Sequence, residues 1–157
     1  MSDPAPPATP EQLERHAATI DSWLREQLAQ NPTVAAVERD DSDGERRWIA
    51  RVTGEEKATF SIWFHLRQRV LHVETYMMPA PEEQLAETYE HLLRRNLRLP
   101  GLRFAIGAED GIFVLGELPV QRIDEGELDR LFGSVYATVE QCFRPAMRLG
   151  FASRFQG

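Results

Sequence analysis

Two histidines near the middle of the chain, His65 and His72, are the best candidates in the sequence for metal ligands, by residue type and by spacing. Residues 67–68 between them are typical of a two-residue turn joining paired strands, which would place Trp63 opposite His72. The two imidazoles would then share one face as diagonal neighbours, about 6–7 Å apart. A metal site needs a third ligand, and only Glu74 is near enough on that face. We therefore interpret both residues as surface histidines and expect no metal site.

No other residue pattern points to catalysis. The sequence holds no G-x-S-x-G elbow, P-loop, G-x-G-x-x-G turn, H-E-x-x-H or paired C-x-x-C motif. The single cysteine, Cys142, lies on the apolar side of a predicted helix, where a buried and unreactive thiol is expected. The carboxylates fall mostly at helix starts, and none is visibly placed in an apolar pocket that would raise its pKa. We expect no enzyme and no cofactor, with an enzyme built on an unrecognised pocket as the least favoured alternative.

Composition and charge limit the class of protein further. The 157 residues carry 18 Lys plus Arg against 25 Asp plus Glu, a net charge of −7, and 42% are hydrophobic. These values are typical of one soluble globular domain, and an acidic chain is a poor partner for nucleic acid. The longest weakly charged stretches fall far below the ~20 apolar residues that span a bilayer, so we expect no membrane partner. Residues 1–10 lack the pattern of a signal peptide and a single cysteine excludes an internal disulfide, so we expect a cytoplasmic protein.

The N-terminal part predicts a tail followed by a long helix. Residues 1–9 carry three prolines, and we expect them to be disordered. Thr9 is the predicted N-cap, Pro10 fits the first helical position, and Gln12 can complete a capping box. Apolar residues then recur every three or four positions, and Asn31, which precedes a proline, marks the end of this helix.

The middle of the chain predicts three strands and a second helix. Residues 48–52, 58–66 and 70–78 are rich in β-branched and aromatic side chains, and turn-forming residues separate them into an antiparallel meander. A helix is expected from Pro81, with acidic residues toward its start and arginines toward its end, as the helix dipole favours. The predicted buried stripe of this helix consists of Leu85, Tyr89, Leu92, Leu93 and Leu97.

The last third predicts a hairpin and a third helix. Strands over 102–108 and 112–118 flank an Asp-Gly turn, and Asp124 then caps a long helix in which Pro145 should cause a kink or an end. The order is therefore α-β-β-β-α-β-β-α, an α+β fold with a mainly antiparallel five-stranded sheet packed with three helices. We expect a single domain over residues 10–150, followed by a C-terminal tail over 151–157.

One face of the meander gathers aromatic and amphipathic side chains. The residues that strand alternation places there are Trp63, His65, Val70, His72 and Tyr76, with Trp48 or Ile49 of the first strand. A large exposed patch of this kind marks an interaction surface, and a free sheet edge beside it would accept an extended peptide as a further strand. Two interpretations stay open at this point. Helices or a second copy of the chain cover this face, or it is an open binding surface.

Residues 87–131 (ETYEHLLRRNLRLPGLRFAIGAEDGIFVLGELPVQRIDEGELDRL) carry a family resemblance. They contain a helix ending in a leucine-rich turn, a hairpin of the form RFAI…DGIFVLGELP and a capped helix beginning D-x-x-E-L. This stretch resembles the YbjN-like family of bacterial proteins, and the expected order of elements is similar to that of type III secretion chaperones of the CesT kind. The resemblance implies an α+β domain that binds polypeptide segments or regulates through protein contacts, commonly as a homodimer, without catalysis.

Taken together, the sequence predicts a chaperone-like or regulatory domain that binds a polypeptide segment on its sheet face and in adjacent grooves. The alternative is an obligate homodimer with a structural or regulatory role, in which the aromatic patch is only its own interface. The predicted partner-binding residues are Trp63, Val70, His72 and Tyr76 on the sheet, with Leu92 and Phe113 as groove candidates.

Overall fold

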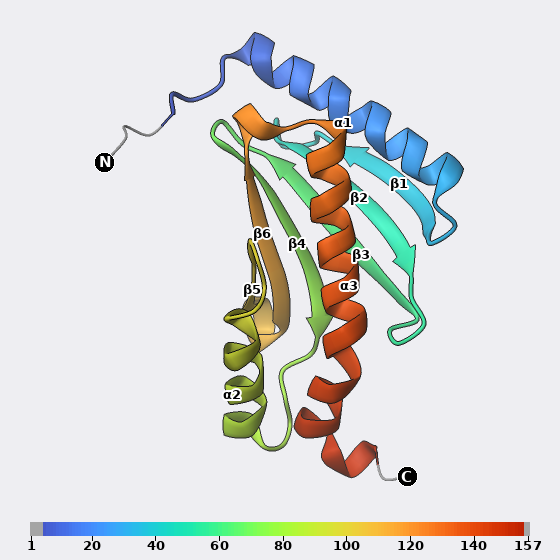
Figure 1. Ribbon diagram of the computed structural model, residues 1–157, viewed down its shortest axis with the longest axis vertical. Helices are drawn as coiled ribbons and strands as arrows, with labels where there is room; N and C mark the ends of the chain where they lie inside the picture. Colours follow the sequence, from blue (N-terminus) through green and yellow to red (C-terminus); the bar gives the residue numbers. More distant parts are fainter. Residues whose placement is uncertain (1–4, 156–157) are drawn as a thin grey trace.

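The computed structural model describes residues 5–155, which form three α-helices and one six-stranded antiparallel sheet. The helices are α1 (Pro10–Gln30), α2 (Leu85–Asn96) and α3 (Glu125–Gly150). The strands are β1 (Val34–Asp40), β2 (Arg46–Thr53), β3 (Thr59–Leu66), β4 (Val70–Met78), β5 (Leu102–Ile106) and β6 (Ile112–Pro119), in the spatial order β1-β2-β3-β4-β6-β5. Three short 3-10 turns, Ala108–Asp110, Val120–Arg122 and Ala152–Arg154, complete the chain. All three helices lie against the same face of the sheet, as Figure 1 shows.

The core is organised around three aromatic rings from three different elements. Trp23 of α1 meets Phe64 of β3 and Phe132 of α3 edge to face, with ring centroids 5.6 and 5.5 Å apart. Phe64 and Phe132 stack at 6.3 Å, and the buried Trp23 indole donates a hydrogen bond to Asp129 Oδ1 at 2.8 Å. Such pairs contribute about 0.5–1.5 kcal/mol each beyond the area they bury, so this cluster ties α1 and α3 to the centre of the sheet.

The predicted helix starts are confirmed where a side chain caps the backbone. Thr9 Oγ1 accepts from the Gln12 amide, and Gln12 Oε1 accepts from the Thr9 amide, which completes the expected capping box. Asp124 accepts from the Glu127 amide at 2.8 Å. Pro145 does not end α3, which continues to Gly150. The next residue, Phe151, is buried.

The sheet has six strands where the sequence predicted five, because β1 was missed. This strand, VAAVERD, contains small and charged residues without an aromatic side chain, and it pairs on one side only, with β2. An edge strand buries fewer side chains than a central strand, so its sequence shows only a weak alternation of hydrophobic and polar residues. The meander therefore has four strands, and the order of elements is α-β-β-β-β-α-β-β-α.

The predicted register between β3 and β4 is wrong by two residues. The turn lies one residue later than predicted, at residues 68–69, since the Arg67 amide donates to the Val70 carbonyl and Leu66 pairs with Leu71. Trp63 consequently lies opposite Glu74, and not opposite His72. Because side chains alternate with a period of two, a two-residue shift leaves every side chain on its predicted face.

Helix α2 begins four residues later than expected and buries a different stripe. Its core-facing residues are Thr88 and Leu92, whereas Leu85 and Leu93 are exposed and Leu97 is 90% exposed. The predicted stripe combined two lines of residues that follow i, i+4 steps on neighbouring sides of the helix. The line of Thr88 and Leu92 is buried, and of the other line only Tyr89 packs partly against the core.

The N-terminal tail expected to be disordered spans residues 1–9, of which 1–4 lie outside the described residues, as do 156–157. Within the described part, the Ala8 amide donates to the Gln68 carbonyl at 2.8 Å, and the Arg69 guanidinium donates to the Ala5 carbonyl. Disorder of residues 1–9 and the domain limits 10–150 stay predictions.

The loop between β2 and β3 is held to α3 by one carboxylate that accepts hydrogen bonds from its backbone amides. Glu140 accepts hydrogen bonds from the amides of Glu55, Glu56 and Lys57 at 2.5, 2.9 and 3.2 Å. A Cβ added at Gly54 would lie 2.2 Å from Glu140 Oε1, so this position requires glycine. Lys57, the only lysine of the chain, donates to the carbonyls of Tyr76 and Met77, where a bulge interrupts β4.

Burial lowers the pKa of Lys57 from 10.5 to about 8, because the charged amine loses hydration. Because Lys57 is the only lysine, selective 13C labelling of lysine gives a single side-chain NMR signal. We expect this signal to titrate near pH 8 in the folded protein and near pH 10.5 in urea. The folded state binds fewer protons between these values, so the contribution of Lys57 to stability rises with pH across this window. A folded-state midpoint near 10.5 would contradict the burial of this amine.

Candidate partner-binding surface

The two faces of the sheet differ in what covers them. Trp48, Phe64, Val73 and Val114 point toward the helices and are buried. The opposite face carries the odd-numbered residues of β2, β3, β6 and β5, with the even-numbered residues of β1 from Ala36 onward and of β4 as far as Tyr76. Bulges place Val34 and Met78 on the covered face. We call it the open face, because no element among residues 5–155 packs on it (Figure 1).

The structure places five of the six predicted site residues on the open face. Trp63 is 37% exposed and Tyr76 43% exposed, and Val70 and His72 are half-buried beside them. Phe113 was expected in a groove, but it lies across from Tyr76 with the two rings edge to face at 5.5 Å. Together they form one aromatic surface that runs across β3, β4 and β6.

The residue of β2 beside Trp63, left open by the sequence, is Ile49. Trp48 belongs to the covered face, where its indole donates to Asp21 Oδ1 at 2.7 Å. Leu115 of β6 extends the open face beyond Glu74 and was not singled out in the sequence. The alternation of β6, with Phe113 and Leu115 two residues apart, is the signal that would have placed it there.

His65 and His72 share the open face as expected, and they are paired directly opposite each other. His65 Nε2 lies 2.6 Å from Glu45 Oε2, and the Arg67 Nε–H faces His65 Nδ1 at 3.4 Å. The bond to His65 holds the pKa of Glu45 below its usual range, the reverse of the shift a general acid needs. Within the described residues, no group of three or more His, Cys, Asp and Glu side chains is arranged to hold a metal ion.

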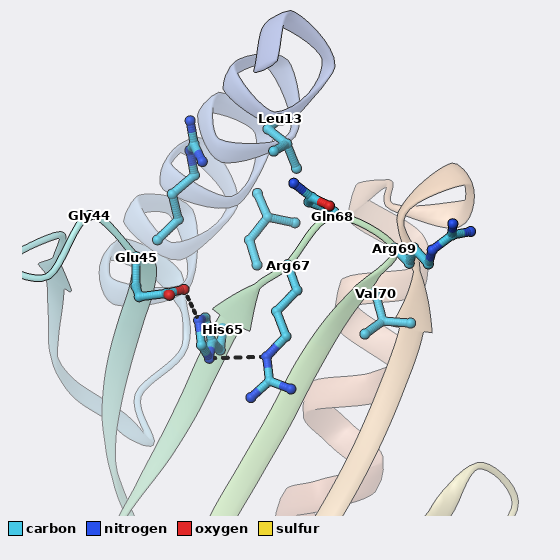
Figure 2. Close-up of a pocket in the computed structure, with 10 residues that line it drawn as sticks. Leu13, Gly44, Glu45, His65, Arg67, Gln68, Arg69 and Val70 are labelled. Atoms are coloured by element: carbon cyan, nitrogen blue, oxygen red, sulfur yellow. Dashed lines mark hydrogen bonds and ion pairs between the residues drawn. The ribbon is translucent and has the colours of Figure 1, made fainter. Parts of the chain in front are cut away.

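A hollow of about 670 Å³ lies at the end of the sheet beside the β3–β4 connection (Figure 2). Figure 2 shows Arg67 turned toward His65, whereas Arg69 points away from it. Arg46, which also lines this hollow, is bound to Glu14 of α1 at 2.7 Å. The basic side chains that line this hollow therefore point in different directions or are already paired. A pocket for one small ligand has polar groups that converge on the ligand.

A second hollow is an apolar groove between α2 and β5, and it contains the predicted site residue Leu92. We call it the α2–β5 groove, of about 330 Å³, lined by Tyr89, Leu92, Leu93, Phe104, Ala105, Ile106 and Ile112. Leu92 forms its buried floor, whereas Leu93 and Ile106 are exposed. The Phe104 amide on the outer edge of β5 already donates to Asn96 Oδ1 at 2.8 Å, so a further strand cannot pair there along its full length.

Cys142 is buried in α3, as expected. Burial raises the pKa of its thiol, which disfavours the reactive thiolate.

Comparisons with known proteins identify one matching family model and several bacterial relatives. Residues 16–146 match the model of the YbjN family, described as "Putative bacterial sensory transduction regulator". Uncharacterized proteins of Mycobacterium bovis and Mycobacterium tuberculosis are 30% identical over 108 residues, which cover 69% of this chain and 59% of theirs. One of Mycobacterium leprae is 29% identical over 114 residues, covering 73% of this chain and 62% of that protein. The chain thus spans about three fifths of the length of these relatives.

One solved structure with a similar chain is that of the heterodimeric complex ExoU–SpcU from the type III secretion system of Pseudomonas aeruginosa. The match has 19% identity and a TM-score of 0.44, and it covers 80% of this chain and 98% of that chain. A score at this level establishes neither a shared fold nor a shared role. Separately, no helix in the described part of the chain has the length and apolar character needed to cross a bilayer.

Tryptophan fluorescence tests whether the open face is free in solution. Trp23 and Trp48 are 1% and 2% exposed and Trp63 is 37% exposed, so we expect one red-shifted, acrylamide-quenchable component that Trp63→Phe removes. The variant Trp48→Phe, which keeps Trp63, should retain that component. Emission that is fully protected from quenching in the wild type would show that something covers the open face.

Proposed function

The chain belongs to the YbjN family, and from this premise we propose that it is a non-enzymatic, chaperone-like or regulatory domain that binds a segment of another polypeptide on its open face. The family model that matches residues 16–146 describes a sensory transduction regulator, and this description supports the proposal. The observation that carries the proposal is the aromatic surface of Trp63, Tyr76 and Phe113 on the uncovered side of the sheet. The expected cytoplasmic location belongs to the same proposal.

The open face suits an extended or amphipathic segment better than a small molecule. Its apolar side chains lie in rows across neighbouring strands, Ile49–Trp63 and Tyr76–Phe113, and do not converge on an enclosed cavity. Val70 and His72 continue the surface toward the β3–β4 connection. Exposed aromatic residues supply contact area at a small cost in side-chain entropy, which is why they recur at binding surfaces.

Site-specific photocrosslinking tests this proposal. A benzophenone amino acid at position 63 should give a discrete adduct with another polypeptide in cells, and Tyr76→Asp in the same chain should remove most of that adduct. The matched control is the probe at Leu28, an exposed apolar residue of α1 on the other side of the molecule, which should give no such adduct. Equal adducts from positions 63 and 28, or none from 63, would overturn the proposal. Adducts only with the same chain would favour the homodimer alternative.

We further propose that the chain forms a homodimer, through α2 and not through the open face. The exposed side of α2 presents Leu85, Leu93 and Leu97 next to Ile106 of β5. Acidic residues, Glu87 and Glu90, occupy the first half of the helix, and Arg94 and Arg95 the last turn. In an antiparallel pair related by a two-fold axis, the acidic half of each α2 faces the basic half of its partner. The α2–β5 groove, with Leu92 at its floor, would then be filled by the second copy.

Sedimentation equilibrium tests this interface. We expect the wild type to have twice the mass of one chain at tens of micromolar, and Leu93→Glu to weaken self-association about a hundredfold, because it buries unpaired charge in the interface. Leu28→Glu, an equivalent change on α1, should leave the mass unchanged. A monomeric wild type would refute the dimer. Dissociation by Trp63→Asp, with Leu93→Glu still dimeric, would instead identify the open face as the self-interface.

A further inference from the structure

The charges of the open face are nearly all paired within the chain. Arg47 bonds to Asp43 at 2.8 Å and lies 3.7 Å from Asp40. Arg51 faces Glu38 at 3.9 Å, and Arg103 meets Glu117 at 3.4 Å. Each arginine of this face therefore has a carboxylate neighbour. Pairing of this kind leaves little net field at those positions.

Glu74 is the exception among the described residues of the open face. It has no Arg or Lys nitrogen within 4.0 Å, and its one ionisable neighbour is His72, whose Nε2 lies 3.7 Å away. The side chain of Glu74 is 42% exposed, so the carboxylate is accessible. It lies on β4 between Trp63 and Leu115 in the cross-strand row, near the middle of the sheet.

Aromatic rings flank this carboxylate. Trp63 is its direct cross-strand partner, and Tyr76 follows two residues later on the same side of β4. A hollow of about 240 Å³ opens beside it, lined by Trp63, His72 and Glu74 with Arg47, Phe64 and His65. A carboxylate next to exposed ring faces is the arrangement that receives a cationic side chain, through an ion pair and cation–π contacts together.

We propose that the segment bound on the open face carries a basic side chain, an arginine or a lysine, that is seated on Glu74 between Trp63 and Tyr76. This inference rests on the proposed function, and it specifies the chemistry of the partner. Apolar residues two positions to either side of the basic residue would reach Ile49 and Leu115 along the same row. High salt would weaken the ion pair between this basic side chain and Glu74 by screening.

NMR titration with a short synthetic peptide tests the cation position. The probe is acetyl-Val-Leu-Arg-Leu-Val-amide, and its control has glutamine in place of arginine. We expect the arginine peptide to shift the Trp63 indole N–H signal and to bind about fivefold more tightly than the control. Both peptides make the same apolar contacts, so this difference measures the charged contact alone. Glu74→Gln should abolish this difference. Glu117→Gln is the matched variant, since that carboxylate is already paired with Arg103, and it should preserve the difference.

The outcomes separate this inference from the proposed function. Equal binding of the two peptides at Trp63, or a difference that survives Glu74→Gln, overturns the cation position and leaves segment binding on the open face intact. An arginine peptide that does not perturb Trp63 overturns it as well. Crosslinks from position 63, measured on the whole chain, decide the proposed function independently of these peptides.

Discussion

The fold depends on the contact of Trp23, Phe64 and Phe132, because it joins the first and last helices to the middle of the sheet. Trp23 and Phe132 are 109 positions apart in sequence, and all six strands lie between them. The bond from the Trp23 indole to Asp129 satisfies the one polar group that this cluster buries. With both long helices held on one side, the other side of the sheet is left to water or to a partner.

Because the helices cover only one face of the sheet, the two faces of the strands differ in composition. On the covered face, side chains such as Val73 and Val114 are fully buried and apolar. On the open face, rings lie among charged residues, most of which are paired across strands, as Arg103 is with Glu117. The charged side chains between the rings divide the apolar surface of this face into smaller areas.

The sequence predicted the features that are encoded locally. Caps, the Asp-Gly hairpin and strand alternation depend on a few neighbouring residues, so the Thr9 capping box, the hairpin before α3 and the set of residues that share a face with Trp63 were predicted. Features that depend on distant partners were not. The edge strand β1 is defined by its pairing with β2. Leu93 is exposed because no other part of the described chain packs on that side of α2. The unpaired state of Glu74 also needed the structure, because it is a property of the whole face.

The bond from the Phe104 amide to Asn96 Oδ1 bears on how this molecule behaves when it is concentrated. A bare β5 edge next to an apolar groove would let copies join strand to strand without limit, as growing fibres do. A side-chain amide placed on that edge removes one donor from the middle of the ladder, at Phe104, and holds α2 against it. Contacts between molecules at this end are thereby directed to side chains, whose shape and charge close an assembly at a finite size.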